Sequence, residues 1–312
     1  MRNPRREEII RAAALAAISR IGYAHGMRIE FLKMQGLGND FLIFDAAAID
    51  ADTHLDSELL RALADRHTGV GFDQALMLEN PRDAHSRVFY RVFNSDGTEV
   101  EQCGNGARCI AALLYDRAPQ LGRDLTMGSP GGTVHARVRD DGLVAVDMGM
   151  PNFDPRSLPM QAEAQARTYS LHVDGADLEI SAVSMGNPHA VLRVADVKSA
   201  PVERLGPKIE RHPRFPNRTN VGFMQIVDRG HILLRVFERG AGETLACGTG
   251  ACAAVAVGKQ RGLLDGEVRV DLPGGTALVA WAGPDQHLWL TGPATTVYTG
   301  SIDLTRFTGA KQ

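Results

Sequence analysis

An internal repeat constrains the fold of this chain more than any other feature of its sequence. The repeat has a constant offset of 144 residues. The matching segments are Arg91-Val92-Phe93 with Arg235-Val236-Phe237, Glu99 with Glu243, Cys103-Gly104 with Cys247-Gly248, and Gly106-Ala107 with Gly250-Ala251. Two copies of one unit predict two similar α/β domains that face each other across a cleft.

Each copy contains a strand, a glycine turn and an apolar helix in that order. Residues 87–93 and 231–237 are rich in valine and aromatic residues, which is typical of strands. The alanine-rich segments 106–114 and 250–258 predict buried helices. Residues 57–65 and 203–210 predict shorter helices, and the proline-bounded segment 151–159 predicts a linker.

The length of 312 residues also favours two domains. We expect the first domain at 27–147 and the second at 148–292, with the tail 293–312 returning to the first. Residues 1–26 contain an arginine-flanked, alanine-rich run that predicts a short amphipathic helix. They lack the long apolar run of a secretory signal, so we treat them as a dispensable extension with Met27 as a candidate start.

Composition excludes several classes of function. The net charge of -3 argues against nucleic-acid and membrane partners, because both select basic surfaces. No segment approaches the roughly 20 apolar residues of a membrane span. Four cysteines are too few for a disulfide scaffold in a chain of this length, so a reducing, cytoplasmic compartment is expected. Their spacing is wider than that of zinc sites, and we expect no metal.

The two Cys-Gly-x-Gly turns, which begin at Cys103 and Cys247, carry the expected chemistry. Glycines let a ligand approach the backbone, and the start of a helix favours both a carboxylate and a thiolate. A cysteine there is expected to titrate below its free pKa of about 8.5 and to act as a base. A second, protonated thiol on the opposite face of an α-carbon would then complete an inversion.

Burial is the alternative explanation for each cysteine, since free cysteine is commonly a small core residue. We apply that explanation to Cys109 and Cys252, which lie inside the predicted helices. For Cys103 and Cys247 it does not account for the glycine turns. The residues alone leave paired catalysis and burial equally open for these two.

Seven motifs, which run in order from Met27 to near the C-terminus, resemble those of the diaminopimelate epimerase family. They are Phe31-Leu32-Lys33-Met34-Gln35-Gly36-Leu37-Gly38-Asn39-Asp40-Phe41, Gly69-Val70-Gly71-Phe72-Asp73-Gln74, Phe93-Asn94-Ser95-Asp96-Gly97, Cys103-Gly104-Asn105-Gly106, Met185-Gly186-Asn187-Pro188-His189, Thr219-Asn220-Val221, and Glu238-Arg239-Gly240 followed by Cys247-Gly248-Thr249-Gly250. Several of these motifs are unusual alone, and together they are highly specific.

The resemblance implies interconversion of LL- and meso-2,6-diaminopimelate, a step of lysine biosynthesis, by a thiolate and a thiol. It implies two pseudo-symmetric α/β domains, each a mixed sheet wrapped around a central helix, with the active site in the cleft between them. It also implies a cytoplasmic homodimer that needs no pyridoxal phosphate, other cofactor or metal.

Carried over motif by motif, the resemblance makes Cys103 and Cys247 the acid/base pair. The residues implied to hold the reacting end of the substrate are Asn39, Gln74, Gly104, Asn105, Gly248 and Thr249. Those implied to hold the distal end are Asn94, Asn187, Asn220, Glu238 and Arg239. A guanidinium suits a carboxylate and Glu238 suits an ammonium group. His189 is expected either to tune a thiol or to orient its loop.

Four other functions remain as alternatives. A proline or hydroxyproline racemase would pair two cysteines in the same way, but it has no need of Glu238, Arg239 and the asparagines. An isomerase of the phenazine-pathway type shares the fold without depending on the cysteine pair. A thiol redox protein would form a reversible disulfide between Cys103 and Cys247, and its activity would return with dithiothreitol. A binding module without catalysis does not explain two matched thiols.

Overall fold

The computed structural model describes residues 28–49, 55–101 and 103–307. The chain divides into two compact units: unit 1 is Met1–Val146 with Pro293–Gln312, and unit 2 is Asp147–Gly292. The helix predicted within residues 1–26 lies outside the described residues.

Unit 1 is a mixed sheet with two α-helices among its described residues. Its elements are β1 (Arg28–Gly36), β2 (Asn39–Asp45), η1 (Ala46–Ala48), α2 (Ser57–Ala64), β3 (Gln74–Glu79), β4 (Phe89–Asn94), β5 (Glu99–Val100), α3 (Gly104–Arg117), η2 (Pro119–Leu121), β6 (Asp124–Ser129), β7 (Gly132–Val138), β8 (Val144–Asp147), β18 (Thr295–Asp303) and η4 (Leu304–Arg306). β1 pairs antiparallel with β18 and β2, and β2 pairs parallel with β3. β4 pairs antiparallel with β3 and β5 and parallel with β6, and β7 joins β6 to β8.

Unit 2 repeats this plan. Its elements are η3 (Pro155–Ser157), β9 (Tyr169–Val173), β10 (Ala176–Ser184), β11 (Pro188–Arg193), α4 (Val202–Glu210), β12 (Asn220–Asp228), β13 (His231–Glu238), β14 (Gly242–Thr244), α5 (Gly248–Gln260), β15 (Glu267–Leu272), β16 (Gly275–Trp281) and β17 (Leu288–Gly292). β10 pairs antiparallel with β9 and β11, and β11 pairs parallel with β12. β13 pairs antiparallel with β12 and β14 and parallel with β15, and β16 joins β15 to β17.

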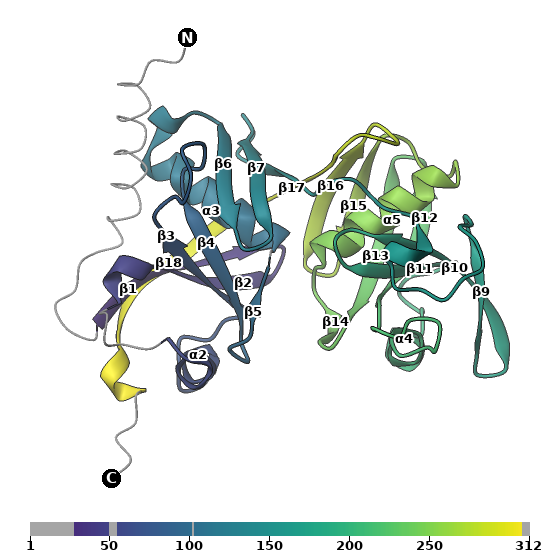
Figure 1. Ribbon diagram of the computed structural model, residues 1–312, viewed down its shortest axis with the longest axis horizontal. Coiled ribbons are helices and arrows are strands. Elements are labelled where there is room, and N and C mark those ends of the chain that lie inside the picture. The colour runs from purple at the N-terminus through teal and green to yellow at the C-terminus, as the bar shows by residue number, and fades with distance from the viewer. Residues whose placement is uncertain (1–27, 50–54, 102, 308–312) are drawn as a thin grey trace. The chain divides into compact units, whose positions relative to one another are not determined.

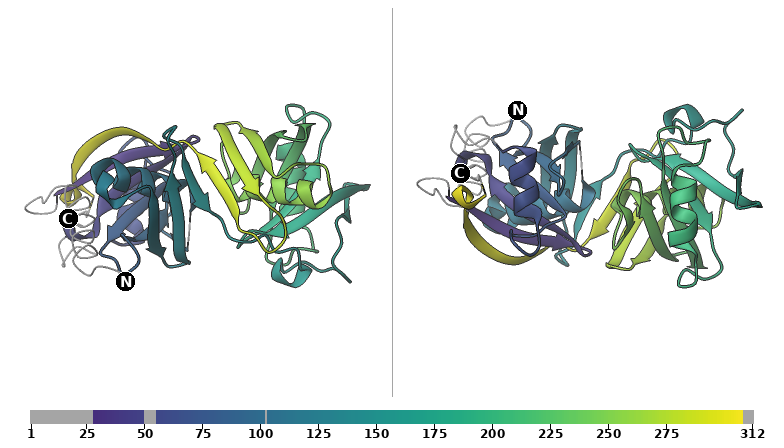
Figure 2. Two further views of the ribbon diagram at one scale, coloured as in Figure 1. Left: turned by 90° about the horizontal axis from the view of Figure 1, so that it is seen from above. Right: turned by 90° about the horizontal axis from the view of Figure 1, so that it is seen from below.

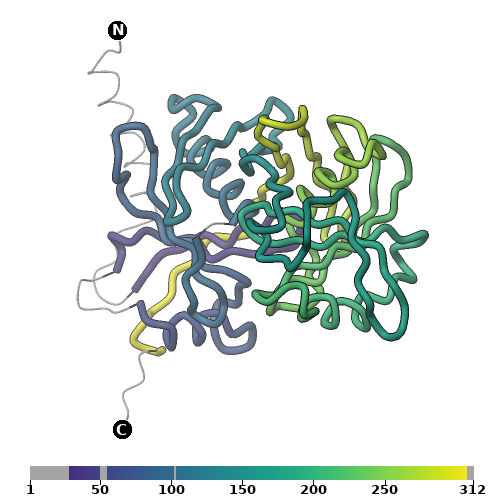
Figure 3. The backbone as a smooth tube through the Cα atoms, turned by 45° about the vertical axis from the view of Figure 1, so that its right-hand side comes forward, coloured from purple at the N-terminus to yellow at the C-terminus, as the bar shows by residue number. Residues whose placement is uncertain are grey.

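The two units therefore share one strand order. They differ in which part of the chain forms the first strand of that order. In unit 2 the strand beside β10 is β9, which directly precedes it in sequence. In unit 1 the same place beside β1 is taken by β18, from the other end of the chain. Figures 1 and 2 show this long yellow strand alongside the purple β1, and Figure 3 shows the chain returning to unit 1 at its end.

The repeat extends to individual ion pairs. Arg91 donates from Nε and Nη2 to Glu99 at 2.7 Å each, which joins β4 to β5. Arg235 donates in the same way to Glu243 at 2.6 and 2.8 Å, which joins β13 to β14. Each two-pronged pair fixes the hairpin that leads into a Cys-Gly-x-Gly turn.

The helices that follow these turns are the central helices of the two units. α3 packs against β1 and β7, and α5 packs against β10, β11, β12 and β16. Gly106 and Gly250 allow the close approach: a Cβ at Gly106 would lie 3.0 Å from Leu76, and one at Gly250 would lie 2.9 Å from Val236. The predicted fold class, two pseudo-symmetric units of mixed sheet around a central helix, is confirmed.

Each unit buries its own apolar core. In unit 1, α2 contributes Leu59, Leu60 and Leu63. In unit 2, α4 contributes Val202, Leu205 and Ile209. The helices predicted at residues 57–65 and 203–210 are confirmed as α2 and α4, the first of them from its amphipathic spacing.

The linker predicted at residues 151–159 is wrong. Pro155 and Leu158 are buried, and Leu158 belongs to the core of unit 2. Asn152 forms a β-bridge with Ser184. The prolines interrupt regular strand pairing, but the segment is anchored in unit 2 through its buried residues. Among the helices of the described residues, none is both long enough and apolar enough to span a bilayer.

Candidate active site

Cys103 is the N-cap residue of α3 and is half-buried. Its backbone is extended, with φ of -142° and ψ of 114°, and its Sγ accepts a hydrogen bond from Gly106 N at 3.4 Å. The thiol in turn points to Asn39 Oδ1 at 4.0 Å. Asn105 Nδ2 donates to the same oxygen at 3.3 Å, so the structure brings these three predicted residues together.

Cys247 is the equivalent N-cap residue of α5, but it is buried, with 4% of its surface exposed. Its Sγ lies 3.5 Å from Thr249 Oγ1. Burial raises the pKa of the Cys247 thiol well above its ordinary value, and the charge of Glu238 raises it further. A backbone hydrogen bond from Gly250 at the start of α5 lowers this pKa, but burial outweighs it, so Cys247 matches the thiol of the pair that was expected to stay protonated.

Each helix start also leaves backbone donors unused by the helix. The first N–H groups of an α-helix have no partner within it and carry partial positive charge. In α3 these groups include Gly104 and Asn105, and in α5 they include Gly248 and Thr249. All four residues were predicted to hold the reacting end, and a carboxylate fits such donors.

Two further predicted residues of unit 1 lie at strand ends. Gln74 begins β3 and Asn94 ends β4, directly opposite each other in the antiparallel ladder. Gln74 Nε2 donates to Asn94 Oδ1 at 2.9 Å. The resemblance implies that these two residues hold opposite ends of the substrate, whereas the structure joins their amides.

In unit 2, Asn187 lies between His189 and Thr249. His189 Nε2 lies 2.9 Å from Asn187 Oδ1, and Asn187 Nδ2 donates to Thr249 Oγ1 at 3.4 Å. Burial lowers the pKa of His189 to about 3, and the charge of Arg239 adds to this shift. The imidazole is therefore neutral, and its Nε2 donates to Asn187.

Asn220 holds the backbone around the remaining predicted residues. Its Nδ2 donates to Pro188 O at 3.0 Å, and its Oδ1 accepts from Arg239 N at 2.9 Å. The Arg239 guanidinium is exposed and makes no ion pair with any described carboxylate, although Nη1 donates to Asn217 O at 3.3 Å. Most of its donors therefore remain for a ligand.

Other site features were missed in the sequence. Thr244 donates to Glu238 Oε1 at 2.5 Å and so holds this carboxylate, whose charge acts on Cys247. Asp73 accepts from Asn39 Nδ2 at 3.1 Å. Asp73 lies within one of the seven motifs, and that position was a usable signal, whereas the role of Thr244 depends on a contact across a hairpin.

The remaining cysteines are not part of these clusters. Cys109 and Cys252 are completely buried, as expected for core residues, and burial raises the pKa of Cys109 to about 12. Within residues 28–49, 55–101 and 103–307, no group of three or more His, Cys, Asp or Glu side chains could hold a metal ion. The roles of the predicted residues toward a substrate stay predictions.

This chain is similar to known proteins in sequence and in fold. The family model described as diaminopimelate epimerase matches residues 31–153 and 181–297. The diaminopimelate epimerase of Azotobacter vinelandii is 53% identical over 278 residues, which cover 89% of this chain and 100% of that protein. The enzyme of the same name from Thioalkalivibrio sulfidiphilus is 55% identical over 280 residues, with the same coverage.

Among solved structures, a hydroxyproline epimerase from Agrobacterium vitis, with bound trans-4-hydroxy-L-proline, has a TM-score of 0.64. It is 14% identical, and the match covers 88% of this chain and 92% of that one. This likeness establishes the shared fold, whereas the two relatives in sequence are similar over their whole length. The chain belongs to the diaminopimelate epimerase family.

Proposed function

We propose that the chain interconverts LL- and meso-2,6-diaminopimelate with Cys103 and Cys247 as the two proton-transfer groups. The observation that carries this proposal is the identity of 53% with a diaminopimelate epimerase over that protein's whole length. The matched positions of the two cysteines, each the N-cap of a central helix, support it.

The proton balance of one turnover is simple. A thiolate removes the α-proton, which forms an S–H bond and leaves a carbanion stabilised by the adjacent carboxylate. The second thiol then delivers its own proton to the opposite face and becomes a thiolate. The protonation states of the two cysteines are thereby exchanged, and proton exchange with solvent resets them. The raised pKa of Cys247 suits it to begin as the acid.

Stabilising the carbanion is the task of the two helix starts. The α-proton of an amino acid is a very weak acid, so charge that develops on the carboxylate must be met by fixed donors. The unused N–H groups at Gly104 and Asn105, with those at Gly248 and Thr249, are such donors. One donor of this kind contributes roughly 10²- to 10³-fold in rate.

The distal half of the substrate needs contacts of its own. Arg239 offers an exposed guanidinium for the distal carboxylate, and Glu238 offers a negative charge for the distal ammonium. Asn94, Asn187 and Asn220 are the proposed amide contacts. A proline racemase has no distal amino-acid end and requires none of these groups.

The remaining parts of the proposal concern the whole protein. The two units correspond to the two epimerase domains, with the tail 293–312 as part of the first. The active enzyme is a cytoplasmic homodimer that uses neither cofactor nor metal. Light scattering after gel filtration measures the mass, and a monomer that retains full activity would refute the dimer.

The experiment that tests the function compares two substrates. Purified protein without added cofactor is incubated with LL-diaminopimelate or with L-proline, and chiral chromatography follows the products. We expect meso-diaminopimelate to accumulate and proline to remain unchanged. Racemisation of proline without epimerisation of diaminopimelate would replace this proposal with the proline-type alternative.

A further inference from the structure

Two amide oxygens in unit 1 are buried without a hydrogen-bond donor among the described residues. They are Asn105 Oδ1 and Gln74 Oε1. Asn105 is 4% exposed, so its oxygen is withdrawn from bulk water. A buried acceptor without a donor is unfavourable, and a bound ligand that supplies the donor would remove the penalty.

The orientation of Asn105 follows from a chain of hydrogen bonds that begins at Asp73. Asp73 Oδ2 accepts from Asn39 Nδ2 at 3.1 Å. Because an ionised carboxylate can only accept, Asn39 must direct its nitrogen to Asp73 and its oxygen away. That oxygen accepts from Asn105 Nδ2 at 3.3 Å, so the oxygen of Asn105 is left without a donor among the described residues.

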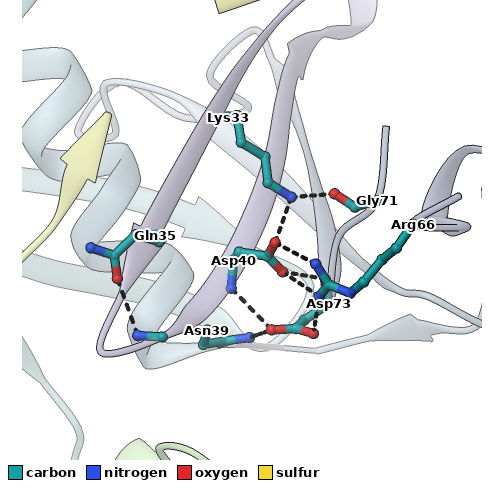
Figure 4. Close-up of polar contacts among 8 residues, drawn as sticks. Lys33, Gln35, Asn39, Asp40, Arg66, Gly71 and Asp73 are labelled. Atoms are coloured by element: carbon teal, nitrogen blue, oxygen red, sulfur yellow. Dashed lines mark hydrogen bonds and ion pairs between the residues drawn. The ribbon is translucent and has the colours of Figure 1, made fainter. Parts of the chain in front are cut away.

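An ion cluster holds Asp73 in place (Figure 4). Arg66 donates to Asp73 Oδ1 at 2.8 Å and to both oxygens of Asp40 at 2.9 Å. Lys33 Nζ lies 2.6 Å from Asp40 Oδ2 and also donates to Gly71 O. Burial raises the pKa of Asp40, but hydrogen bonds from Arg66 and Lys33 outweigh it and hold the pKa well below its usual range.

The cluster also ties the two acidic residues to each other's backbone. Asp40 N donates to Asp73 Oδ2 at 3.0 Å, and Asp73 N donates to Asp40 Oδ1 at 2.8 Å. These bonds join β2 to the loop before β3 at the end of the parallel ladder where Asn39 lies. Two carboxylates so close together need the two cations to offset their repulsion. Asp73 is therefore fixed as an acceptor beside Asn39.

A second chain begins at Asp96 and ends at Gln74. Thr98 Oγ1 donates to Asp96 Oδ1 at 2.6 Å, which lowers the pKa of Asp96. With its one proton used, the hydroxyl accepts from Asn94 Nδ2 at 3.1 Å. Asn94 Oδ1 then accepts from Gln74 Nε2 at 2.9 Å, and Gln74 Oε1 is left without a donor.

We propose that Asp73 and Asp96 are positioning residues whose carboxylates orient these two amide chains. As a result, Asn105 and Gln74 each present an oxygen to an ammonium group of the substrate. This inference rests on the proposed function. Amide oxygens attract an ammonium group and repel a carboxylate. Unit 1 thus separates its contacts: backbone N–H groups at the start of α3 for the carboxylate, and side-chain oxygens for the ammonium group.

The first test is the Asp73→Asn variant. Its new amide can donate to Asn39, which lets Asn39 and Asn105 turn over and present a nitrogen to the ammonium group. We expect the KM for LL-diaminopimelate to rise roughly 10- to 100-fold, as for a lost hydrogen bond to a charged group, with a smaller change in kcat. Circular dichroism and thermal melting show whether the variant is folded.

A matched variant separates orientation from structural damage. Arg66→Gln breaks the ion cluster but leaves Asp73 an acceptor, so its KM should stay within about threefold even where its Tm falls.

Asp96→Ala tests the second chain, with Asp65→Ala as its control. An asparagine at 96 would keep an oxygen that accepts from Thr98, whereas alanine frees the Thr98 hydroxyl to donate to Asn94, which lets the amides of Asn94 and Gln74 turn over. Asp65 accepts from Thr68 N and Oγ1 at 2.7 and 2.9 Å, as Asp96 does from Thr98, but among the described residues no amide chain continues from Thr68. Only Asp96→Ala should raise the KM.

The outcomes are distinguishable. If the unmutated chain turns over diaminopimelate but Asp73→Asn and Asp96→Ala keep its KM, or if Arg66→Gln raises the KM as much as Asp73→Asn, this inference alone is overturned. If the unmutated chain does not turn over diaminopimelate, the proposed function fails, and this inference fails with it.

Discussion

At the residue scale, the two matched cysteines lie in different surroundings. Cys103 is half-buried and faces a neutral amide oxygen of Asn39. Cys247 is buried and faces the charge of Glu238, with Thr249 as a neighbouring hydroxyl. The two copies of the repeated unit therefore place their cysteines in unlike surroundings.

Replacing either thiol tests this division of roles. Cys103→Ala and Cys247→Ala should each lower epimerisation by at least roughly 10²- to 10⁴-fold, the contribution of a positioned acid or base. Initial rates with LL-diaminopimelate measure the loss, and Cys109→Ala is the control because it lies outside the site. Near-normal turnover in either site variant would refute the paired assignment.

Glu238→Gln tests the cause of the raised pKa of Cys247. Removing the negative charge makes the thiolate less unfavourable, so the pKa of Cys247 should fall and its thiolate should form at lower pH. The pH dependence of iodoacetamide alkylation, followed by peptide mass mapping of Cys247, measures this shift. Glu243→Gln is the control. It removes a negative charge from the same hairpin, but that charge is paired with Arg235, so the pH dependence of Cys247 alkylation should not change. An unchanged profile in Glu238→Gln would assign the raised pKa to burial alone.

At the element scale, the second glycine of each Cys-Gly-x-Gly turn serves packing. Gly106 and Gly250 lie one turn into α3 and α5, where a Cβ would press on Leu76 or Val236. Their backbones have no positive φ, so close helix-to-strand packing is what requires glycine. The glycine pattern was visible in the sequence, but its reason appears only once the facing strands are known.

Alanine substitutions should therefore differ between the two helices. Gly250→Ala should destabilise unit 2 by about 1–3 kcal/mol, because Val236 is β-branched and stiff and a new Cβ would also lie 3.3 Å from Cys247 Sγ. Gly106→Ala should cost less, because it meets the flexible end of Leu76. Urea unfolding of both variants measures the difference. An equal or reversed order would contradict this account.

At the scale of the whole molecule, sequence reasoning recovered the duplication, the central helices and the family. It did so because hydrophobic periodicity and the Cys-Gly-x-Gly turns are local signals, and the turns recur at an offset of 144 residues. It missed that Pro155 and Leu158 anchor residues 151–159 in unit 2, since prolines there indicate only the absence of regular pairing. It also missed the cluster of Lys33, Asp40, Arg66 and Asp73, whose members are distant in sequence and individually resemble solvated surface charges.

The exchanged strand β18 gives a prediction for the whole chain. Deleting residues 293–312 removes the partner of β1 and should expose its edge, so unit 1 should lose stability while unit 2 keeps its own complete strand order. Hydrogen exchange should show lost protection in β1 and β2 and retained protection in β12 and β13. A control that lacks only residues 308–312 keeps β18. Equal loss in both units would show that they do not fold separately.

The most direct test of the central claim follows the transferred proton in D₂O. LL-diaminopimelate is incubated with the enzyme until only a small fraction of the substrate has been converted. Substrate and product are then analysed by mass spectrometry and NMR. Because the incoming proton comes from a solvent-equilibrated thiol opposite the base, each meso product should carry one deuteron at the inverted α-carbon, while recovered LL substrate keeps its proton. A product that retains the original proton, or a substrate that gains deuterium as fast as the product, would contradict the action of two thiols on one carbon.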